Sequence, residues 1–400
     1  MRKLLLITLV SFIFLSIKAQ NLSISDSAIY SLITCSPGEE VYAKFGHTAI
    51  RVNDSVSGID VVFNYGIFSF ETENFYYKFI KGETDYQLGV YDTKFFLPEY
   101  AARNSVVWEQ ILNLSVTEKR ALLNLLLSNY EPQNRVYRYN FVFDNCATRP
   151  RDKILASLNG YVKFKQNSDS KTFRQWVGTF VGFDTWLKFG IDLVFGRDAD
   201  RYTTTAESEF LPENLMEEFQ SADILTKNNE NKRLVKERKI LVEKNVIVKN
   251  NDFWLFKPLS ISILILIIGT FITIIDLIKK SHHVLFDTIL QFITGLGGFI
   301  VLYLMLISIH PLVKNNLNIL WLNPLNFFIA FLIWIRPLRI ALFFYQIANI
   351  ILLFSALIVF ALSIQEINIA FFPIIVLLLM RSASWFAITK RKVLKHRNSK

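Results

Sequence analysis

The chain has 400 residues, a formal net charge of +10 at pH 7 and 52% hydrophobic residues. Its long apolar runs all follow residue 255, so we expect a soluble domain with one sizeable core, followed by a membrane domain. The basic residues fall in a juxtamembrane segment, in short loops between apolar runs and at the C-terminus, which indicates lipid contact and membrane topology and argues against nucleic-acid binding.

Residues 1–19 have the order of a secretory signal peptide. Arg2 and Lys3 precede the apolar run Leu4 to Ile17, and cleavage is expected after Ala19. The alternative is an uncleaved anchor, although the run is shorter than the roughly 20 residues that a membrane span requires. After cleavage, a soluble domain at residues 20–212 would lie outside the membrane.

The first expected elements of this domain are strands. An apolar strand, Ile29 to Thr34, precedes a glycine turn, after which His47 opens a second short strand. A third strand, Ile59 to Asn64, would pair with the second as a hairpin. In that arrangement His47 could act as a general base, and Asn64 could orient its ring.

Helices and strands alternate further along the chain. We expect a helix at residues 71–80, strands at residues 85–91 and 106–114, and a helix at residues 119–129 preceded by Ser115 and Glu118 at capping-box spacing. This mixture predicts the α+β class. The many aromatic residues of this region suit either a core or an acyl-chain groove, and both interpretations stay open.

Cys146 is placed on a turn between a strand and a helix. Val136 to Phe143 favours a strand and Arg151 to Leu158 favours a helix, while Pro150 fits only a helix's first turn. A thiol near the positive end of a helix should lose its proton easily, and His47 could activate it as a nucleophile. Alternatively, Cys146 is a small buried residue or is paired with Cys35, which is more simply explained as packed in the first strand. No metal-type cluster occurs, and no cofactor is expected.

Two polar segments follow the expected catalytic turn. The run Gly196 to Arg201 suits a loop of paired surface charges, with a substrate-binding role as the alternative. Residues 213–255 are heavily charged with both signs, and they predict a helical or hairpin stalk that carries the soluble domain to the bilayer.

The C-terminal part, residues 256–388, predicts a five-helix transmembrane domain. Basic residues gather in alternate loops and in the tail at residues 389–400, so the positive-inside rule is met at every loop if the soluble domain is outside. Each apolar segment is near the length of a span; the segments are about Pro258 to Ile278, Val284 to Ile309, Asn318 to Ile335, Ile340 to Leu362 and Ile367 to Ala387.

Taken together, these motifs resemble the Lnb family of lipoprotein N-acyltransferases. The order His, Asn, Cys is also similar to that of circularly permuted papain-like enzymes, among them the lecithin:retinol acyltransferase-like proteins. The resemblance implies a permuted papain-like periplasmic domain followed by an all-α bundle of five transmembrane helices in the bacterial inner membrane, with a cytoplasmic C-terminus. The likeness covers nearly the whole mature chain and is carried by Leu32 to Gly38, Phe45 to Arg51, Asn64 to Gly66, Asp144 to Arg149 and Phe210 to Pro212.

The resemblance further implies that an acyl chain moves from a phospholipid, through a Cys146 thioester, to the α-amine of the N-terminal cysteine of a diacylglyceryl lipoprotein. Asn145, Tyr139 and Arg149 are then candidates for substrate or oxyanion contacts. His310, in an outer loop, either helps to bind a lipid headgroup or the amine, or is an interfacial polar residue without a catalytic part. A membrane-anchored cysteine peptidase or amidase and a non-catalytic membrane scaffold are the rival hypotheses.

Overall fold

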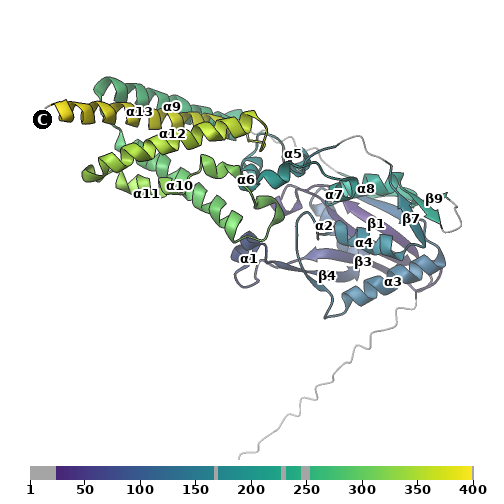
Figure 1. Cartoon of the computed structure of the whole chain (residues 1–400). Coiled ribbons are helices and arrows are strands. Elements are labelled where there is room, and N and C mark those ends of the chain that lie inside the picture. Colours follow the sequence, from purple (N-terminus) through teal and green to yellow (C-terminus); the bar gives the residue numbers. More distant parts are fainter. Residues whose placement is uncertain (1–23, 166–169, 227–230, 245–252, 399–400) are drawn as a thin grey trace, which may run out of the picture.

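The computed structural model describes residues 24–165, 170–226, 231–244 and 253–398, and it shows a sheet-rich ectodomain beside a helical membrane domain (Figure 1). The expected signal peptide at residues 1–19 lies outside the described residues. The α+β prediction for the first domain is confirmed by this alternation of strands and helices.

Within the described ranges, seven antiparallel strands form the central sheet, in the order β10-β5-β1-β2-β3-β4-β6. The expected hairpin is confirmed, because β2 and β3 pair with Ala49 opposite Asn64. β1 pairs with β2 on its other side and places Cys35 opposite His47. The strands are β1 (Ile29–Cys35), β2 (His47–Asp54), β3 (Ile59–Ile67), β4 (Asp85–Asp92), β5 (Val107–Leu112), β6 (Val136–Arg138) and β10 (Val235–Val242).

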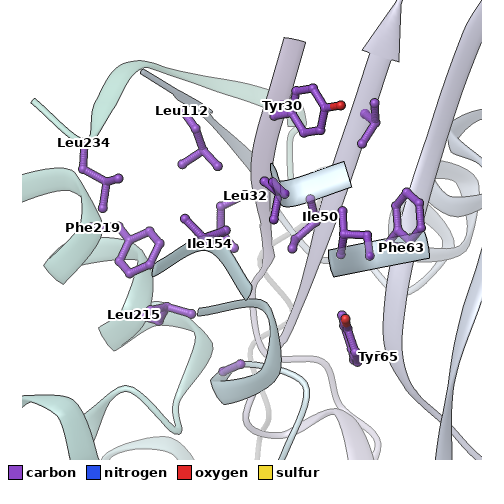
Figure 2. Packing of buried hydrophobic residues seen from close by; sticks show 14 of the residues in the cluster. Tyr30, Leu32, Ile50, Phe63, Tyr65, Leu112, Ile154, Leu215, Phe219 and Leu234 are labelled. Atoms are coloured by element: carbon purple, nitrogen blue, oxygen red, sulfur yellow. The ribbon is translucent and has the colours of Figure 1, made fainter. Parts of the chain in front are cut away.

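Three helices cover one face of this sheet: α3 (Val116–Tyr130), α4 (Thr148–Ser157) and α8 (Pro212–Ser221). Ile154 of α4 and Phe219 of α8 face strand residues such as Leu32 in one buried cluster (Figure 2). The capping box at the start of α3 is confirmed, because Ser115 and Glu118 exchange hydrogen bonds. Burial of these apolar side chains is the main force that holds α4, and with it Cys146, against the sheet.

The opposite face is covered by α2 (Thr93–Ala102), a helix that the sequence patterns did not indicate. Phe96 and Tyr100 of α2 pack with Cys35, Ala49 and neighbouring strand residues in a second cluster. α2 has Pro98 inside and little segregation of apolar residues, which explains why periodicity did not reveal it. It nevertheless supplies one wall of the site described below.

The expected strand at residues 136–143 is shorter than predicted, since β6 ends at Arg138. The side-chain oxygen of Asn140 accepts the backbone N–H groups of Val142 and Phe143, at 3.2 and 3.1 Å. Such a local side-chain bond competes with the ladder of a sheet and ends the strand.

The predicted stalk at residues 213–255 is wrong for most of its length. Residues 212–221 form α8 in the core, and β10 pairs with β5 as an edge of the main sheet. β10 is an edge strand, and most of its side chains are exposed. Its position at the edge of the sheet therefore explains the many charged residues of this segment, which had suggested a stalk. A small second sheet contains β7 (Gly160–Lys163), β8 (Asp223–Thr226) and β9 (Asn231–Arg233).

Four of the described helices are long and apolar enough to cross a membrane. They correspond to the first, second, fourth and fifth predicted spans. α9 and α13 pack together, as do α12 and α13, in a bundle that extends away from the ectodomain (Figure 1). Their bounds are α9 (Pro258–Lys279), α10 (Val284–Leu306), α12 (Arg339–Ala361) and α13 (Phe371–Asn398).

The third predicted span is not one long helix. It contains a 3-10 turn, Leu317–Leu320, and α11 (Leu325–Leu332), which has 8 residues. The break lies where the segment meets α10: a Cβ on Gly298 would lie 2.2 Å from the carbonyl oxygen of Leu322. Close backbone contact of this kind replaces the regular side-chain packing of a continuous helix.

This broken segment nevertheless runs antiparallel alongside α10. Leu322 lies against Gly298, and Asn326 donates to Thr294, at 3.1 Å. Trp334, further along, donates to Thr288, at 2.9 Å. The segment therefore passes most of the length of α10, and the prediction of five long helices is replaced by four long helices and one broken one.

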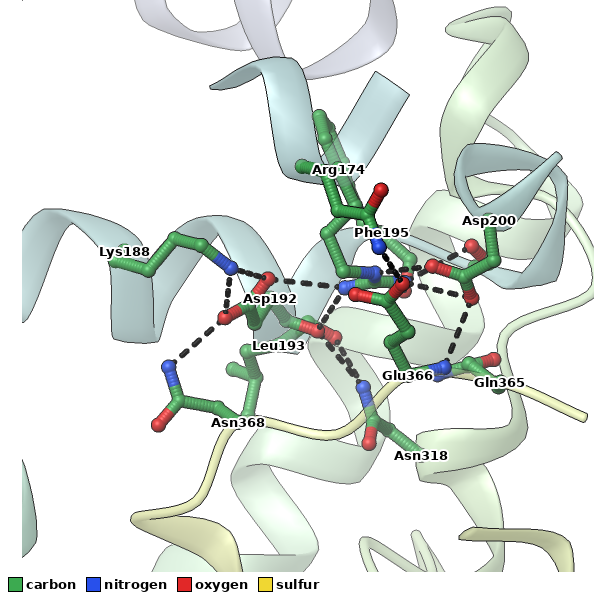
Figure 3. A network of polar contacts seen from close by, with 12 residues as sticks. Arg174, Lys188, Asp192, Leu193, Phe195, Asp200, Asn318, Gln365, Glu366 and Asn368 are labelled. Atoms are coloured by element: carbon green, nitrogen blue, oxygen red, sulfur yellow. Dashed lines mark hydrogen bonds and ion pairs between the residues drawn. The ribbon is translucent and has the colours of Figure 1, made fainter. Parts of the chain in front are cut away.

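A buried polar network joins the ectodomain to the outer loops of the membrane domain (Figure 3). Arg174 of α5 (Phe173–Val181) pairs with Asp192 of α6 (Trp186–Val194) and with Asp200, and Lys188 also pairs with Asp192. Asn318 and Asn368, from two outer loops, donate to Asp192. The prediction of a surface loop at residues 196–201 is wrong for Asp200, because that carboxylate is part of this buried network.

Apolar contacts accompany this network. Phe189 and Leu193 of α6 pack on the outer end of the membrane bundle beside Trp321 and Phe371. Leu312, from the loop after α10, packs into the cluster that α5 forms with Phe210 and its neighbours. The two domains therefore share cores as well as ion pairs.

The ectodomain also contains the helix α1 (Phe75–Lys81) and the single turn α7 (Thr205–Ser208).

Candidate active site

The turn before α4 is held by the side chain of Asn145, which is buried. Its oxygen accepts the backbone N–H groups of Ala147 and Thr148, at 2.8 and 3.0 Å, and its amide donates to the carbonyls of Phe141 and Phe210, at 2.7 and 2.8 Å. Cys146 is thereby fixed two residues before the first residue of α4. The amide protons of Asn145 are both used, so its suggested role as an oxyanion donor is replaced by a structural one.

His47 is the first residue of β2, and its ring is oriented by Asn64 of β3. His47 Nε2 lies 2.6 Å from Asn64 Oδ1. The amide of Asn64 donates in turn to the hydroxyl of Tyr91, which leaves its oxygen to accept from His47. Nε2 therefore carries the proton of the neutral ring, and Nδ1 is the nitrogen that can act as a base. Tyr100 stacks against the same ring, with centroids 6.0 Å apart.

Gly66 lies between the thiol and the imidazole. A Cβ on this glycine would lie 3.4 Å from Cys146 Cβ and 3.7 Å from His47 Cε1, so both side chains border one small space. Gly66 has a φ of +93° and follows Asn64 at an irregularity in the β3–β4 ladder. This conformation suits glycine, and the irregularity turns the end of β3 toward α4.

The backbone N–H groups of Thr48 and of Cys146 itself lie near enough to the sulfur of Cys146 to favour its charged form. Thr48 directly follows His47, so β2 brings both an imidazole and a backbone N–H group to the same thiol. Preorganised backbone donors of this kind stabilise negative charge that forms on sulfur or on a nearby oxygen.

Burial sets the protonation of this pair in the resting protein. It raises the pKa of Cys146 to about 11, although the hydrogen bonds from Thr48 and Cys146 oppose the rise. It also lowers the pKa of His47 to about 4, against the effect of Asn64 and with a further contribution from Arg103. The prediction that the thiol loses its proton easily is therefore wrong for the resting state, because burial outweighs the helix end. The thiol and the imidazole are both neutral near pH 7.

Tyr139 and Arg149 are the other residues suggested near the thiol. They differ in whether their polar groups are already engaged by neighbouring side chains. Tyr139 stacks on Tyr86 at 4.1 Å, and burial, followed by Cys146, raises the pKa of Tyr139 well above its usual value, so its hydroxyl remains a donor. Arg149 makes a bidentate pair with Asp144 and covers the ring of Tyr137. We assign Arg149 to holding the turn, since its guanidinium is already engaged on both sides.

His310 lies at the junction between the domains. Its Nε2 donates to the carbonyl of Phe79 in α1, at 2.8 Å, and its ring packs edge to face against Phe79. These contacts give His310 a role in docking the outer loop on α1. The suggestion that the ring also takes part in binding a headgroup or an amine stays a prediction.

The second cysteine, Cys35, is fully buried in β1 and is not bonded to Cys146. It packs with Ala49, Phe96 and their neighbours in the cluster under α2, as the apolar strand predicts. The disulfide alternative is therefore wrong for this structure, and Cys146 remains a free thiol.

Contributions to the site that were missed from the sequence, besides the wall supplied by α2, include Gly66 as the spacer, the Thr48 N–H and the Tyr91 hydroxyl. Gly66 belongs to the Asn-Tyr-Gly motif that drew attention to Asn64, so a signal was present. The other two depend on pairing between distant strands and have no local pattern.

These features define a membrane protein whose α+β ectodomain carries a partly buried Cys, His and Asn cluster at the end of its central sheet, above a helical transmembrane region. A family model described as the Lnb N-terminal periplasmic domain matches residues 17–179, and one described as the Lnb transmembrane domain matches residues 249–393. No curated protein and no solved structure matches the chain. The protein belongs to the Lnb family, with a periplasmic N-terminal domain and a C-terminal transmembrane domain.

Proposed function

We propose that this protein is a thiol-dependent acyltransferase that moves a fatty acyl chain from a phospholipid to the N-terminal cysteine α-amine of bacterial lipoproteins. The observation that supports this most is the meeting of Cys146, His47 and Asn64 around Gly66 in a domain locked to a membrane bundle. Such a cluster makes acyl-enzyme intermediates, and attachment to the bilayer favours lipid substrates over soluble ones. Its chain order, His, Asn, Cys, is that of permuted papain-like enzymes.

In the first half-reaction, His47 Nδ1 takes the proton of the Cys146 thiol as the sulfur attacks the ester carbonyl of the phospholipid. The N–H groups of Thr48 and Cys146, which favour negative charge on the sulfur, are the proposed donors to the carbonyl oxygen as the charge moves there. The carbon–oxygen bond of the ester then breaks. His47 returns the proton to the departing oxygen, so lysophospholipid leaves and a thioester remains.

In the second half-reaction, the α-amine of a diacylglyceryl-cysteine lipoprotein attacks the thioester. His47 takes a proton from the amine and delivers it to the sulfur, which restores the thiol and releases the N-acylated lipoprotein. Because the ring is neutral at rest, it is ready to accept a proton in both steps. The identity of the acceptor comes from the family alone.

We further propose that the protein lies in the inner membrane with its C-terminus in the cytoplasm. The broken segment beside α10 then counts as a crossing, and the total is odd. With the ectodomain in the periplasm, this places the basic loops at residues 279–280 and 336–339 and the basic tail in the cytoplasm, as the positive-inside rule requires.

Intact-mass measurement of the full chain, reconstituted with phospholipid, tests the activity. We expect an acyl adduct on Cys146 that hydroxylamine removes, together with free lysophospholipid. Cys146→Ala and His47→Ala should lack the adduct, and Cys35→Ala should keep it, because Cys35 is sealed in the core. Adding a diacylglyceryl peptide should discharge the adduct and add the acyl mass to the peptide.

Other outcomes identify the rival functions. Cleavage of a peptide without lysophospholipid would indicate a cysteine peptidase or amidase. If cells with the Cys146→Ala variant grow as well as cells with the wild-type protein, the protein is a non-catalytic scaffold.

A further inference from the structure

α1 and the loop before it expose an unusual number of large apolar side chains. The exposed fraction of Tyr76 is 71%, and the other exposed members are Phe70, Tyr77, Phe79 and Ile80. A surface patch of contiguous aromatic side chains on a folded domain indicates a binding surface. None of these five side chains takes part in the Cys146 cluster.

α1 is fastened to the outer end of the membrane helix α10. The carbonyl of Lys81 accepts the N–H of Ile309, at 2.8 Å, and the carbonyl of Phe79 accepts from His310. Gly82 ends α1 with a φ of +83°, and a Cβ there would lie 2.9 Å from the side chain of Ile309. Figure 1 shows α1 at the junction of the two domains, beside the end of α10.

The patch on α1 is therefore continuous with the surface that faces lipid. Leu306, Ile307 and Ile309, at and just beyond the end of α10, are exposed large apolar residues like those along the bilayer-facing side of that helix. Tyrosine and other aromatic residues at the level where a transmembrane helix ends are typical of the interface between lipid headgroups and acyl chains. Because the patch is continuous with the lipid-facing surface, we infer that the outer leaflet of the bilayer covers it.

A series of packed rings leads from this patch into the domain. Phe79 packs on Phe75, Phe75 on Phe68, Phe68 on Tyr86, and Tyr86 on Tyr139, with centroids 6.1, 5.8, 4.9 and 4.1 Å apart. Tyr86 belongs to the buried cluster against which both Tyr139 and Cys146 pack, so the series ends at the cluster that the thiol contacts. The series gives an unbroken run of aromatic contacts from the patch at the bilayer to the cluster beside Cys146.

We propose that α1 lies in the headgroup region of the outer leaflet and is the portal through which a phospholipid acyl chain passes along these rings to Cys146. This inference rests on the proposed function for the identity of the lipid. The position of α1 in the membrane can be measured without any activity.

Spin labelling of the full chain in phospholipid vesicles measures that position. In a Cys146→Ala background the buried Cys35 should not react, so a nitroxide can be placed at Tyr76→Cys alone. Ile267→Cys, on the exposed side of α9, is the reference in lipid, and Tyr161→Cys, on β7, is the reference in water. We expect Tyr76→Cys to be accessible to oxygen, as Ile267→Cys is, and shielded from a water-soluble nickel relaxant relative to Tyr161→Cys.

Two results would overturn the placement. One is relaxant accessibility at Tyr76→Cys equal to that at Tyr161→Cys. The other is shielding that depends on protein concentration, since that would identify a second copy of the chain as the occupant.

A second measurement tests the portal itself. We expect the double variant Tyr76→Ser, Tyr77→Ser to form the Cys146 adduct about ten-fold more slowly from long-chain phospholipid in vesicles, because the loss of apolar contact weakens entry. A short-chain phospholipid dissolved in water should react at the wild-type rate, and Tyr161→Ser should match wild type with both substrates. Equal slowing with both substrates would assign α1 a structural role. A wild-type chain that forms no adduct would refute the proposed function and leave the labelling result valid.

Discussion

At the level of single residues, the most consequential feature is that burial keeps both the thiol and its base neutral. The backbone donors from Thr48 and Cys146 reduce the cost of forming a thiolate but do not overcome desolvation. In the proposed mechanism, the proton therefore moves to His47 as the sulfur attacks. This differs from an enzyme that rests as a thiolate and imidazolium pair, in which the proton has already moved.

This neutral resting state predicts slow alkylation of Cys146. A raised thiol pKa lowers the thiolate fraction at every pH below it, so the rate with iodoacetamide should keep rising with pH toward about 11. Mass spectrometry of the alkylated chain over a pH series measures the rate, with free cysteine as the control. A plateau already reached below pH 8 would contradict the prediction and indicate a resting ion pair.

The hydroxyl of Tyr91 should matter to catalysis although it is not expected to touch substrate. It accepts the amide of Asn64 and so keeps the amide oxygen directed at His47. Tyr91→Phe should lower kcat about five-fold, the effect of one hydrogen bond of about 1 kcal/mol, with little change in KM. Kinetics with phospholipid vesicles test this, and Asn64→Ala should have a larger effect. A Tyr91→Phe enzyme with wild-type kcat would show that the sheet alone orients the ring.

The sequence suggested His47, Asn64 and Cys146 as candidates because each lies in or beside a short, strongly patterned strand or turn. The protonation states of His47 and Cys146 were not predicted, because desolvation depends on α2 and on the packing of the whole domain. The roles proposed for Asn145 and His310 were altered for a related reason. Their hydrogen-bond partners, Phe210 and Phe79, lie 65 and 231 residues away along the chain.

At the level of elements, the turn before α4 depends on several hydrogen bonds made by one side chain, that of Asn145. Asn145 caps the helix start and also ties the turn to Phe141 and Phe210. Asn145→Ala should lower the free energy of unfolding by about 2 to 4 kcal/mol, because it removes a cap and leaves two carbonyls without a donor.

Thermal unfolding in detergent measures this loss, and Asn214→Ala, which removes a single bond to the carbonyl of Ser208, is the matched control. Asn145→Asp keeps the cap but directs a carboxylate at two carbonyls, so it should also be destabilised. An Asn145→Ala protein as stable as the Asn214→Ala protein would show that packing of Ile154 is sufficient to hold the turn.

The elements that were predicted well have strong local signals, such as the β2–β3 hairpin, the capping box of α3 and the long membrane helices. The elements that were predicted poorly depend on distant partners. The charged segment at residues 212–242 belongs to the domain because Leu215 and Phe219 meet α4, and because β10 finds the free edge of β5. The third span is broken where the backbone of Leu322 meets Gly298.

At the level of the whole molecule, the two domains are joined by the network around Arg174 and by α1. Arg174→Met would leave Asp192 and Asp200 without their shared partner in a buried site, and we expect a loss of about 3 to 5 kcal/mol in stability. Arg201→Met is the matched control, because Arg201 pairs with Glu207 at the exposed surface, where a pair contributes about 0 to 1 kcal/mol.

Thermal unfolding of the two variants in the same detergent gives the comparison. A shift for Arg174→Met no larger than that for Arg201→Met would mean that the apolar contacts of α6 and Leu312 alone hold the domains together.

Attachment at two separate places also fixes the height of the sulfur above the bilayer. If the substrate is a phospholipid, as we propose, its ester has to rise out of the leaflet to meet Cys146 at this height. Turnover should then follow the physical state of the surrounding lipid, such as chain order and lateral pressure, which set how often a phospholipid protrudes. Under the proposed function, the physical state of the membrane affects the rate, and its phospholipids supply the acyl chain.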